Sequence, residues 1–233
     1  MLILACFDVG IILSFVITFF ILIISNYITG YIIATLHRKA LDSECDPERF
    51  LRMTDQQEKR RGKEQRIACR IAINRSAGYI SLGNFQTARE YLEGVDTSYL
   101  SEKDGSFLIY TINLILCLYE LGEFEKAENL YETNLVKLCP LGKRLQRSVE
   151  ILIGERYYYL GKYDLSYEHL NKLRVCDLEK RQYLSILFRM AQIEMLKGET
   201  EQAVKKLKKI EKLGNKLYIV KCTQEILANI SKG

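Results

Sequence analysis

Residues that could carry out chemistry are few in this 233-residue chain, and they lie far apart. The two histidines, His37 and His169, are separated by 132 positions, and His169 follows Glu168 in a stretch with helical periodicity. Such a histidine is more often a solvated helix residue than a general base. No pair of carboxylates forms a recognisable catalytic motif, and no glycine-rich phosphate loop is present. The sequence therefore predicts that the chain is not an enzyme.

The seven cysteines are an odd number, and no two lie closer than 22 residues. This spacing excludes CxxC redox motifs and paired zinc ligands. Cys69, Cys117 and Cys222 fall in amphipathic stretches, where a free thiol behaves as a small apolar residue. Unpaired thiols suit a reducing compartment. We expect no metal site, no cofactor and no small-molecule substrate.

The elements that position these residues are expected to be helices. Only two prolines occur in the chain, so long stretches are free of helix breakers. The first 36 residues are almost entirely apolar, whereas residues 37–233 are charged and periodic. The fold class is therefore predicted to be all-α, with two unlike parts.

The first 36 residues have the character of a membrane anchor. From Val9 to Leu36 no charged residue occurs, and about 20 apolar residues are enough to span a bilayer. A signal peptide would have basic residues before a shorter apolar region, yet only Asp8 precedes this one. A core helix would be apolar on one stripe only. We predict a single transmembrane anchor over residues 1–36.

The distribution of lysine and arginine predicts how this anchor is oriented. None precedes the apolar run, while His37, Arg38 and Lys39 follow it directly. By the positive-inside rule, the N-terminus is expected outside and the larger part in the cytoplasm. The alternative is the inverted topology, with the larger part acting outside the cytoplasm as a chaperone-like or envelope-assembly factor.

Residues 37–65 are predicted to form a juxtamembrane helical linker. Asp46 followed by Pro47 is typical of a helix start, with the aspartate as cap and the proline at the first helical position. Residues 37–66 contain nine basic and seven acidic residues. This near balance favours a solvated linker over an electrostatic tether to anionic lipid headgroups.

Residues 66–233 contain a repeated pattern. Four glycines, spaced by 39, 39 and 37 residues, each stand near the middle of a pair of helical patterns. A small residue follows five places later and a bulky one four places after that. This pattern is typical of a helical hairpin, with glycine in a left-handed turn, and such hairpins must stack to bury their apolar faces. The glycines are Gly83, Gly122, Gly161 and Gly198; the small residues are Ala88, Ala127, Ser166 and Ala203; the bulky ones are Leu92, Tyr131, Leu170 and Leu207.

These segments resemble the tetratricopeptide repeat (TPR). Three turns read Leu-Gly-x-aromatic, and the third unit also has the family's small residue and tyrosine, at Gly154 and Tyr157. The second and fourth units depart from the pattern at Ile115 and Glu194. The resemblance implies a TPR-like α-solenoid of about four helical hairpins, and the final stretch KLYIVKCTQEILANI is expected to be a C-terminal capping helix.

The resemblance also implies a concave groove, lined by the first helix of each hairpin, that binds a protein or peptide partner. The repeat register and the run of three tyrosines at 157–159 yield a set of candidate partner-binding residues. An apolar residue recurs at one groove position of every unit, which suggests either an apolar segment as ligand or coverage by the helix over 47–62. A register shifted by one or two would instead make these core residues. The candidates are Asn74, Asn113, Tyr119, Glu155, Tyr158, Tyr159, Phe188, Arg189 and Gln192.

The function predicted from these features is a membrane-anchored adaptor or scaffold. An enzyme acting on membrane substrates is the alternative of another class, but no motif supports it. Five lysines over 205–212 are expected to form a solvated helix face rather than a contact with lipid or nucleic acid, since no aromatic residues are interleaved with them. They are Lys205, Lys206, Lys208, Lys209 and Lys212.

Overall fold

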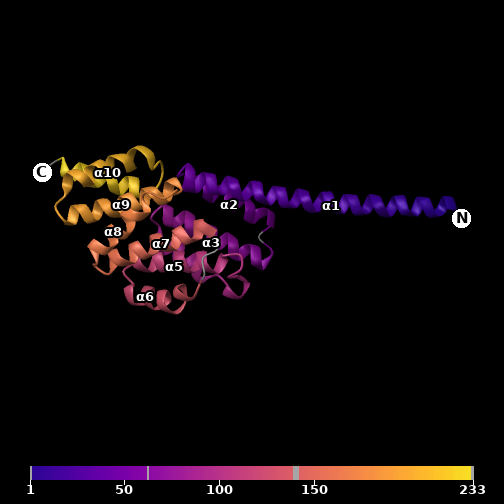
Figure 1. The fold of residues 1–233 in the computed structure, drawn as a ribbon, viewed down its shortest axis with the longest axis horizontal. Helices are drawn as coiled ribbons and strands as arrows, with labels where there is room; N and C mark the ends of the chain where they lie inside the picture. Colours follow the sequence, from indigo (N-terminus) through magenta and orange to yellow (C-terminus); the bar gives the residue numbers. More distant parts are fainter. Residues whose placement is uncertain (1, 62, 139–141, 232–233) are drawn as a thin grey trace. The chain divides into compact units, whose positions relative to one another are not determined.

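The computed structural model describes residues 2–61, 63–138 and 142–231, with side chains from residue 13 onward. Within these ranges the protein is helical and contains no strand, which confirms the all-α prediction (Figure 1). The chain divides into two compact units, residues 1–39 and 40–233.

The first unit is one long helix, α1 (Leu2–Arg38). The helical stretch Leu13–Ser43 is long and apolar enough to cross a membrane. Its large apolar side chains are exposed, including Phe15 at 74% and Phe19 at 63%. A helix with an exposed apolar surface of this length is a candidate membrane-spanning segment.

A π-helical turn, η1 (Lys39–Ser43), spans the boundary between the two units, and α2 (Pro47–Arg61) follows it. Eight further helices form four pairs, and two short 3-10 helices follow the first two pairs. A single helix, α11 (Tyr218–Ile230), comes last. The pairs are α3 (Gln65–Ser81) with α4 (Phe85–Glu93), α5 (Ser106–Glu120) with α6 (Phe124–Thr133), α7 (Gly142–Tyr159) with α8 (Tyr163–Leu173), and α9 (Lys180–Leu196) with α10 (Thr200–Leu213); the 3-10 helices are η2 (Thr97–Tyr99) and η3 (Leu135–Lys137).

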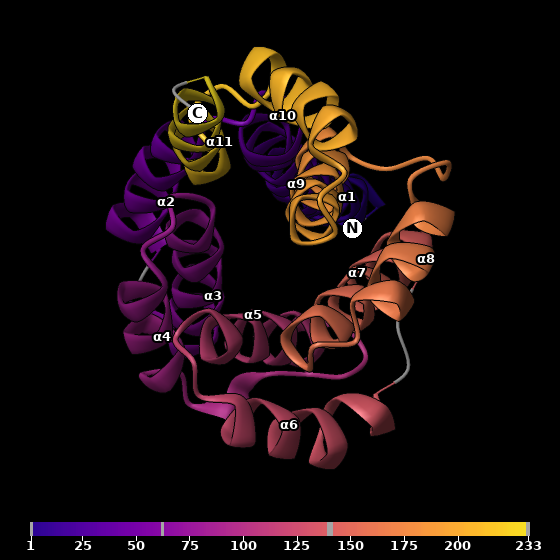
Figure 2. The ribbon, with the colours of Figure 1, turned by 90° about the vertical axis from the view of Figure 1, so that its left-hand side faces the viewer.

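Within this unit the first helices of the four pairs lie on the inner side and their partners on the outer side (Figure 2). The helix α5 contacts both α3 and α7, and α7 also contacts α9, so the first helices follow one another side by side. The last helix, α11, packs against α9 and α10. Side chains of the first helices can therefore converge on a common interior.

Each pair is joined by a glycine in the predicted left-handed conformation. The φ angles are 77° at Gly83 and Gly122, 71° at Gly161 and 79° at Gly198, and residues with a Cβ adopt such angles at a cost. The four small residues that follow are all 0% exposed, as close helix packing requires: Ala88, Ala127, Ser166 and Ala203. The glycine turns and the buried small positions confirm the hairpin prediction.

The bulky residue four places after each small one, at the seam where the two helices of a pair meet, is buried in three of the four pairs. Leu92, Leu170 and Leu207 are 0% exposed, whereas Tyr131 is only half-buried. The guanidinium of Arg156 lies 4.2 Å from the centroid of the Tyr131 ring. This ring therefore makes a cation–π contact and is not fully enclosed by other side chains.

The helix α2 begins as predicted, because the backbone N–H of Arg49 donates to Asp46 Oδ1 at 2.9 Å. It is packed rather than solvated: Phe50 is 4% exposed and Thr54 is 0% exposed. It lies against α3 so closely that a Cβ on Gly78 would stand 2.6 Å from Leu51 Cδ2. Most of the stretch expected to be a linker thus belongs to the folded unit.

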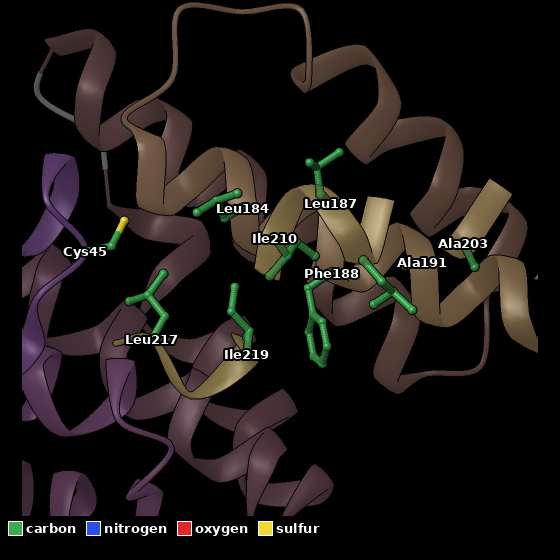
Figure 3. Close-up of a cluster of buried hydrophobic side chains, with 10 residues drawn as sticks. Cys45, Leu184, Leu187, Phe188, Ala191, Ala203, Ile210, Leu217 and Ile219 are labelled. Carbon is green, nitrogen blue, oxygen red and sulfur yellow. The ribbon is translucent and has the colours of Figure 1, made fainter. Parts of the chain in front are cut away.

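The beginning of this unit is joined to its end. The buried carboxylate of Asp42 accepts hydrogen bonds from Arg144 of α7 at 2.6 Å and from Arg181 of α9 at 2.8 Å. The backbone N–H of Lys216 donates to the Cys45 carbonyl at 3.2 Å, and its ammonium group lies 2.8 Å from Glu48. Cys45 also lies in the apolar cluster that joins α9, α10 and residues 217–219 (Figure 3).

The cysteines with described side chains are free thiols. Cys45, Cys69 and Cys117 are buried, Cys222 is half-buried and Cys176 is exposed. Burial raises the pKa of the Cys117 thiol to about 12, which keeps it unreactive. The remaining two, at positions 6 and 139, lie outside the residues whose side chains are described.

Candidate binding site

A cavity of about 170 Å³ lies on the inner side of the hairpins. Its wall includes residues of α3, α5, α7 and α9, together with the start of α4 and residues 217–219. Apolar side chains such as Ile112, Leu116 and Ile151 make up much of the wall, and Asn113, Ser148, Gln182 and Ser185 supply polar groups. A largely apolar wall with a few polar groups is the usual character of a binding pocket.

Arg189 is the centre of the polar network in this wall. Its Nε donates to Glu155 Oε2 at 2.7 Å, and both residues are 6% exposed. Its other nitrogens donate to Tyr159 Oη at 2.8 Å, to Gln192 Oε1 at 2.9 Å and to Glu120 Oε1 at 3.3 Å. The cation is thus held by two carboxylates and two neutral oxygens.

Two tyrosine rings cover the guanidinium group of Arg189. Its Cζ lies 4.0 Å from the centroid of the Tyr158 ring and 4.8 Å from that of Tyr159. These contacts stabilise a cation that has been removed from water. The network therefore draws groups from α5, α7 and α9 to one point, although they are distant in sequence.

Burial and charge act together on the titrating groups of this network. Burial alone would disfavour the charged guanidinium of Arg189, but Glu155, Tyr159 and Glu120 raise its pKa well above the ordinary value. Burial raises the pKa of Glu155, and the charge of Arg189 opposes that rise. Burial also raises the pKa of Tyr159 far above the usual range, so its hydroxyl stays protonated.

The structure brings most of the sequence-predicted candidates to this place. Asn113, Glu155, Phe188 and Arg189 line the cavity, and Gln192 hydrogen-bonds Arg189. Tyr158 and Tyr159 are not in the cavity wall, but both contact Arg189. These candidates therefore lie in the cavity wall or beside it, on α5, α7 and α9.

Two candidates, Tyr119 and Asn74, lie outside the cavity wall. Tyr119 is 1% exposed and stacks on Tyr159 with centroids 4.8 Å apart, so it is a core residue that no partner can reach. Its neighbour Glu120 lines the cavity instead, so at the end of α5 the cavity-lining position comes one residue later than the repeat pattern predicts. Asn74 is half-buried on α3 and is not in the cavity wall, which begins three residues later at Ala77.

Other cavity residues were not among the candidates. Leu217, Tyr218 and Ile219 come from the segment that the sequence marked only as a cap, and no local pattern indicates that they reach the first hairpin. The contact is made by Tyr218, whose ring centroid lies 5.4 Å from that of Phe85. The helix over 47–62, the suggested cover of the groove, contributes none of the described lining residues.

The lysines of α10 are largely on the surface, as expected, but Lys206 is not. Its ammonium group forms an ion pair with Glu194 of α9, which is 0% exposed and also accepts a hydrogen bond from Tyr167 Oη at 2.8 Å. A buried carboxylate requires such partners. Glu194 lies four residues before the turn glycine Gly198, and Lys206 compensates for its buried charge.

Among the residues with described side chains, no group of three or more metal-ligating side chains occurs. His169 lies on α8 outside the cavity wall, with Nε2 2.9 Å from the carbonyl oxygen of Glu150. Comparison with known proteins adds no assignment, since no protein family, curated protein or solved structure matches the chain.

Proposed function

We propose that this protein is a membrane-anchored adaptor that binds a segment of a partner protein in the cavity between its helical hairpins. In this proposal the four pairs are a TPR-like solenoid and α11 caps it. The observation that carries the proposal is that the first helix of every pair contributes to the wall of one cavity. The left-handed glycine turns support the repeat assignment.

The size of the cavity favours a side chain as the occupant rather than a whole helix. About 170 Å³ is close to the engineered cavity of about 150 Å³ that accommodates a benzene molecule. A partner segment would therefore insert one bulky apolar side chain, while its backbone stays at the opening. Confinement to a membrane would raise the effective concentration of any partner held at the same surface.

Photo-crosslinking in intact cells tests the partner proposal. A benzoylphenylalanine at Ile151, in the cavity wall, should produce a discrete adduct with a partner protein. The same group at Val175, which is 81% exposed in the loop after α8, serves as the control and should not produce that adduct. Adding Ser185→Trp to fill the cavity should abolish the adduct. An adduct that persists in this filled variant, or no adduct at all, would refute the proposal.

We also propose that α1 is retained as the single membrane anchor, with the hairpin unit in the cytoplasm. The lysine and arginine residues that follow the apolar run support this orientation, as do the five free thiols.

Cys176 provides the test of orientation, since Cys69 and Cys117 are buried. A membrane-impermeant maleimide should label Cys176 only after the cells are permeabilised. The labelling that is present in the wild type and lost in the C176S variant is the labelling of Cys176. Labelling of Cys176 in intact cells would instead establish the inverted topology.

A further inference from the structure

A second cavity of about 330 Å³ adjoins the first. The two share Glu120, Phe188, Arg189 and Tyr218, so they form neighbouring compartments of one site. The second compartment lies between the end of α5, the middle of α9 and one face of α11. The side chains that belong to it alone are Gln192, Cys222, Glu225, Ile226 and Asn229.

The two compartments differ in character. The first has an apolar wall, with Ile112, Leu116 and Ile151 among its residues. The second has two carboxylates, Glu120 and Glu225, together with the polar side chains of Arg189, Gln192 and Asn229. An occupant that fits both must therefore combine an apolar group with a polar or charged one.

The balance of charge indicates the sign of that second group. Arg181, in the first compartment, is paired with Asp42 at 2.8 Å, and Arg189 is paired with Glu155. The closest countercharge of each of these two cations thus lies outside the second compartment. Glu120 lies 3.3 Å from the already paired Arg189 and hydrogen-bonds the Tyr159 side chain, while Glu225 is exposed with no salt bridge among the described contacts. The second compartment carries an excess of negative charge.

We propose that the partner segment inserts a bulky apolar side chain into the first compartment and places a basic side chain in the second, between Glu120 and Glu225. This inference rests on the proposed function and names the chemistry of the partner. An opposite charge here would be favoured because Glu120 is only 20% exposed, so solvent screens it incompletely. An acidic residue at the same place would be repelled.

Synthetic peptides test this inference on the full-length protein in lipid nanodiscs. The probe is a fluorescent pentapeptide with Phe-Lys at its centre, and the comparison peptides have Phe-Glu, Phe-norleucine or Ala-Lys in the same positions. We expect the Phe-Lys peptide to bind about tenfold more tightly than the Phe-Glu peptide, measured by fluorescence anisotropy. The Ala-Lys peptide should bind weakly because it has no apolar anchor.

Substitutions of Glu120 and Glu225 test whether these two carboxylates cause the preference for the lysine peptide. Because Glu225 is exposed, Glu225→Gln should retain the fold while it reduces the preference for lysine over glutamate. The E120Q/E225Q variant should reduce this preference to about twofold or less. The matched control is Glu211→Gln, an exposed glutamate of α10 that lines neither compartment, and it should retain the full preference.

Cys222 reports where the peptide binds, because it lines the second compartment whereas Cys176 is exposed elsewhere. The Phe-Lys peptide should slow maleimide labelling of Cys222 and leave labelling of Cys176 unchanged. Equal or tighter binding of the Phe-Glu peptide, or no binding of any peptide, would overturn the inference. Protection of Cys222 by dodecylamine, an alkyl amine without a peptide backbone, would also overturn it, because the site would then accept a basic amphiphile rather than a partner segment. If crosslinking from Ile151 still captures a partner through the cavity, the proposed function survives this failure; if both experiments fail, neither stands.

Discussion

Replacing Glu155 with leucine should lower the free energy of unfolding by about 3 kcal/mol. The substitution leaves the Arg189 guanidinium buried without its closest countercharge, and breaking a buried ion pair typically costs about 3–5 kcal/mol. The lower end is expected because Glu120 lies 3.3 Å from the same guanidinium and compensates for part of the lost charge. Urea unfolding of the full chain in detergent, followed by circular dichroism, measures the change.

A second substitution separates the loss of the pair from damage to the packing. In the variant E155L/R189M neither charge remains buried, so most of the lost stability should return. Glu168→Gln is the control, because its ion pair with Lys172 is exposed and its loss should leave the free energy of unfolding nearly unchanged. If E155L unfolds at the same urea concentration as the wild type, the Arg189 network does not stabilise the interior.

Leu170→Ala should have a comparable effect, with a loss of about 2–5 kcal/mol. Leu170 is 0% exposed and belongs to an apolar cluster with Ile186 and Met190. It also fits against Gly154 so closely that a Cβ there would stand 2.4 Å from Leu170 Cδ2. The surrounding helices are too tightly packed to close the resulting cavity completely. The same unfolding measurement would show the loss.

The repeat provides a matched control for this prediction. Tyr131 occupies the equivalent position in the second pair but is only half-buried, with its ring against Arg156. Tyr131→Ala should therefore cost about 1 kcal/mol, chiefly the loss of the cation–π contact. If Leu170→Ala and Tyr131→Ala lowered the free energy of unfolding equally, burial of the side chain at this repeat position would not determine stability.

The parts of the fold that local chemistry determines could be predicted from the sequence. A glycine that ends a helix in the left-handed region, and a small residue where two helices touch, are required by the hairpin itself. Gly161 and Ser166 show this, with a φ angle of 71° at the glycine and a fully buried serine. The same register placed Glu155 and Arg189 on the inner side, where the structure brings them together.

The parts that depend on contacts between distant segments could not be predicted in this way. Nothing around Asp42 indicates that its carboxylate meets Arg144 and Arg181, more than a hundred residues away. Likewise, the periodicity of α11 does not show that Tyr218 reaches Phe85. Tyr119 was placed wrongly because a fixed repeat register does not follow the helix through its last turn.

The hydrogen bonds that join residues 44–48 to residues 215–216 change how the hairpin unit can come apart. A row of repeats with free ends loses structure from either end, one unit at a time. Here the side chain of Asn215 donates to the Glu44 carbonyl across 171 positions, so the last hairpin is tied to the first segment. Residues 44–48 and residues 215–216 cannot separate without loss of these bonds. Melting of the four hairpins should therefore be concerted rather than stepwise.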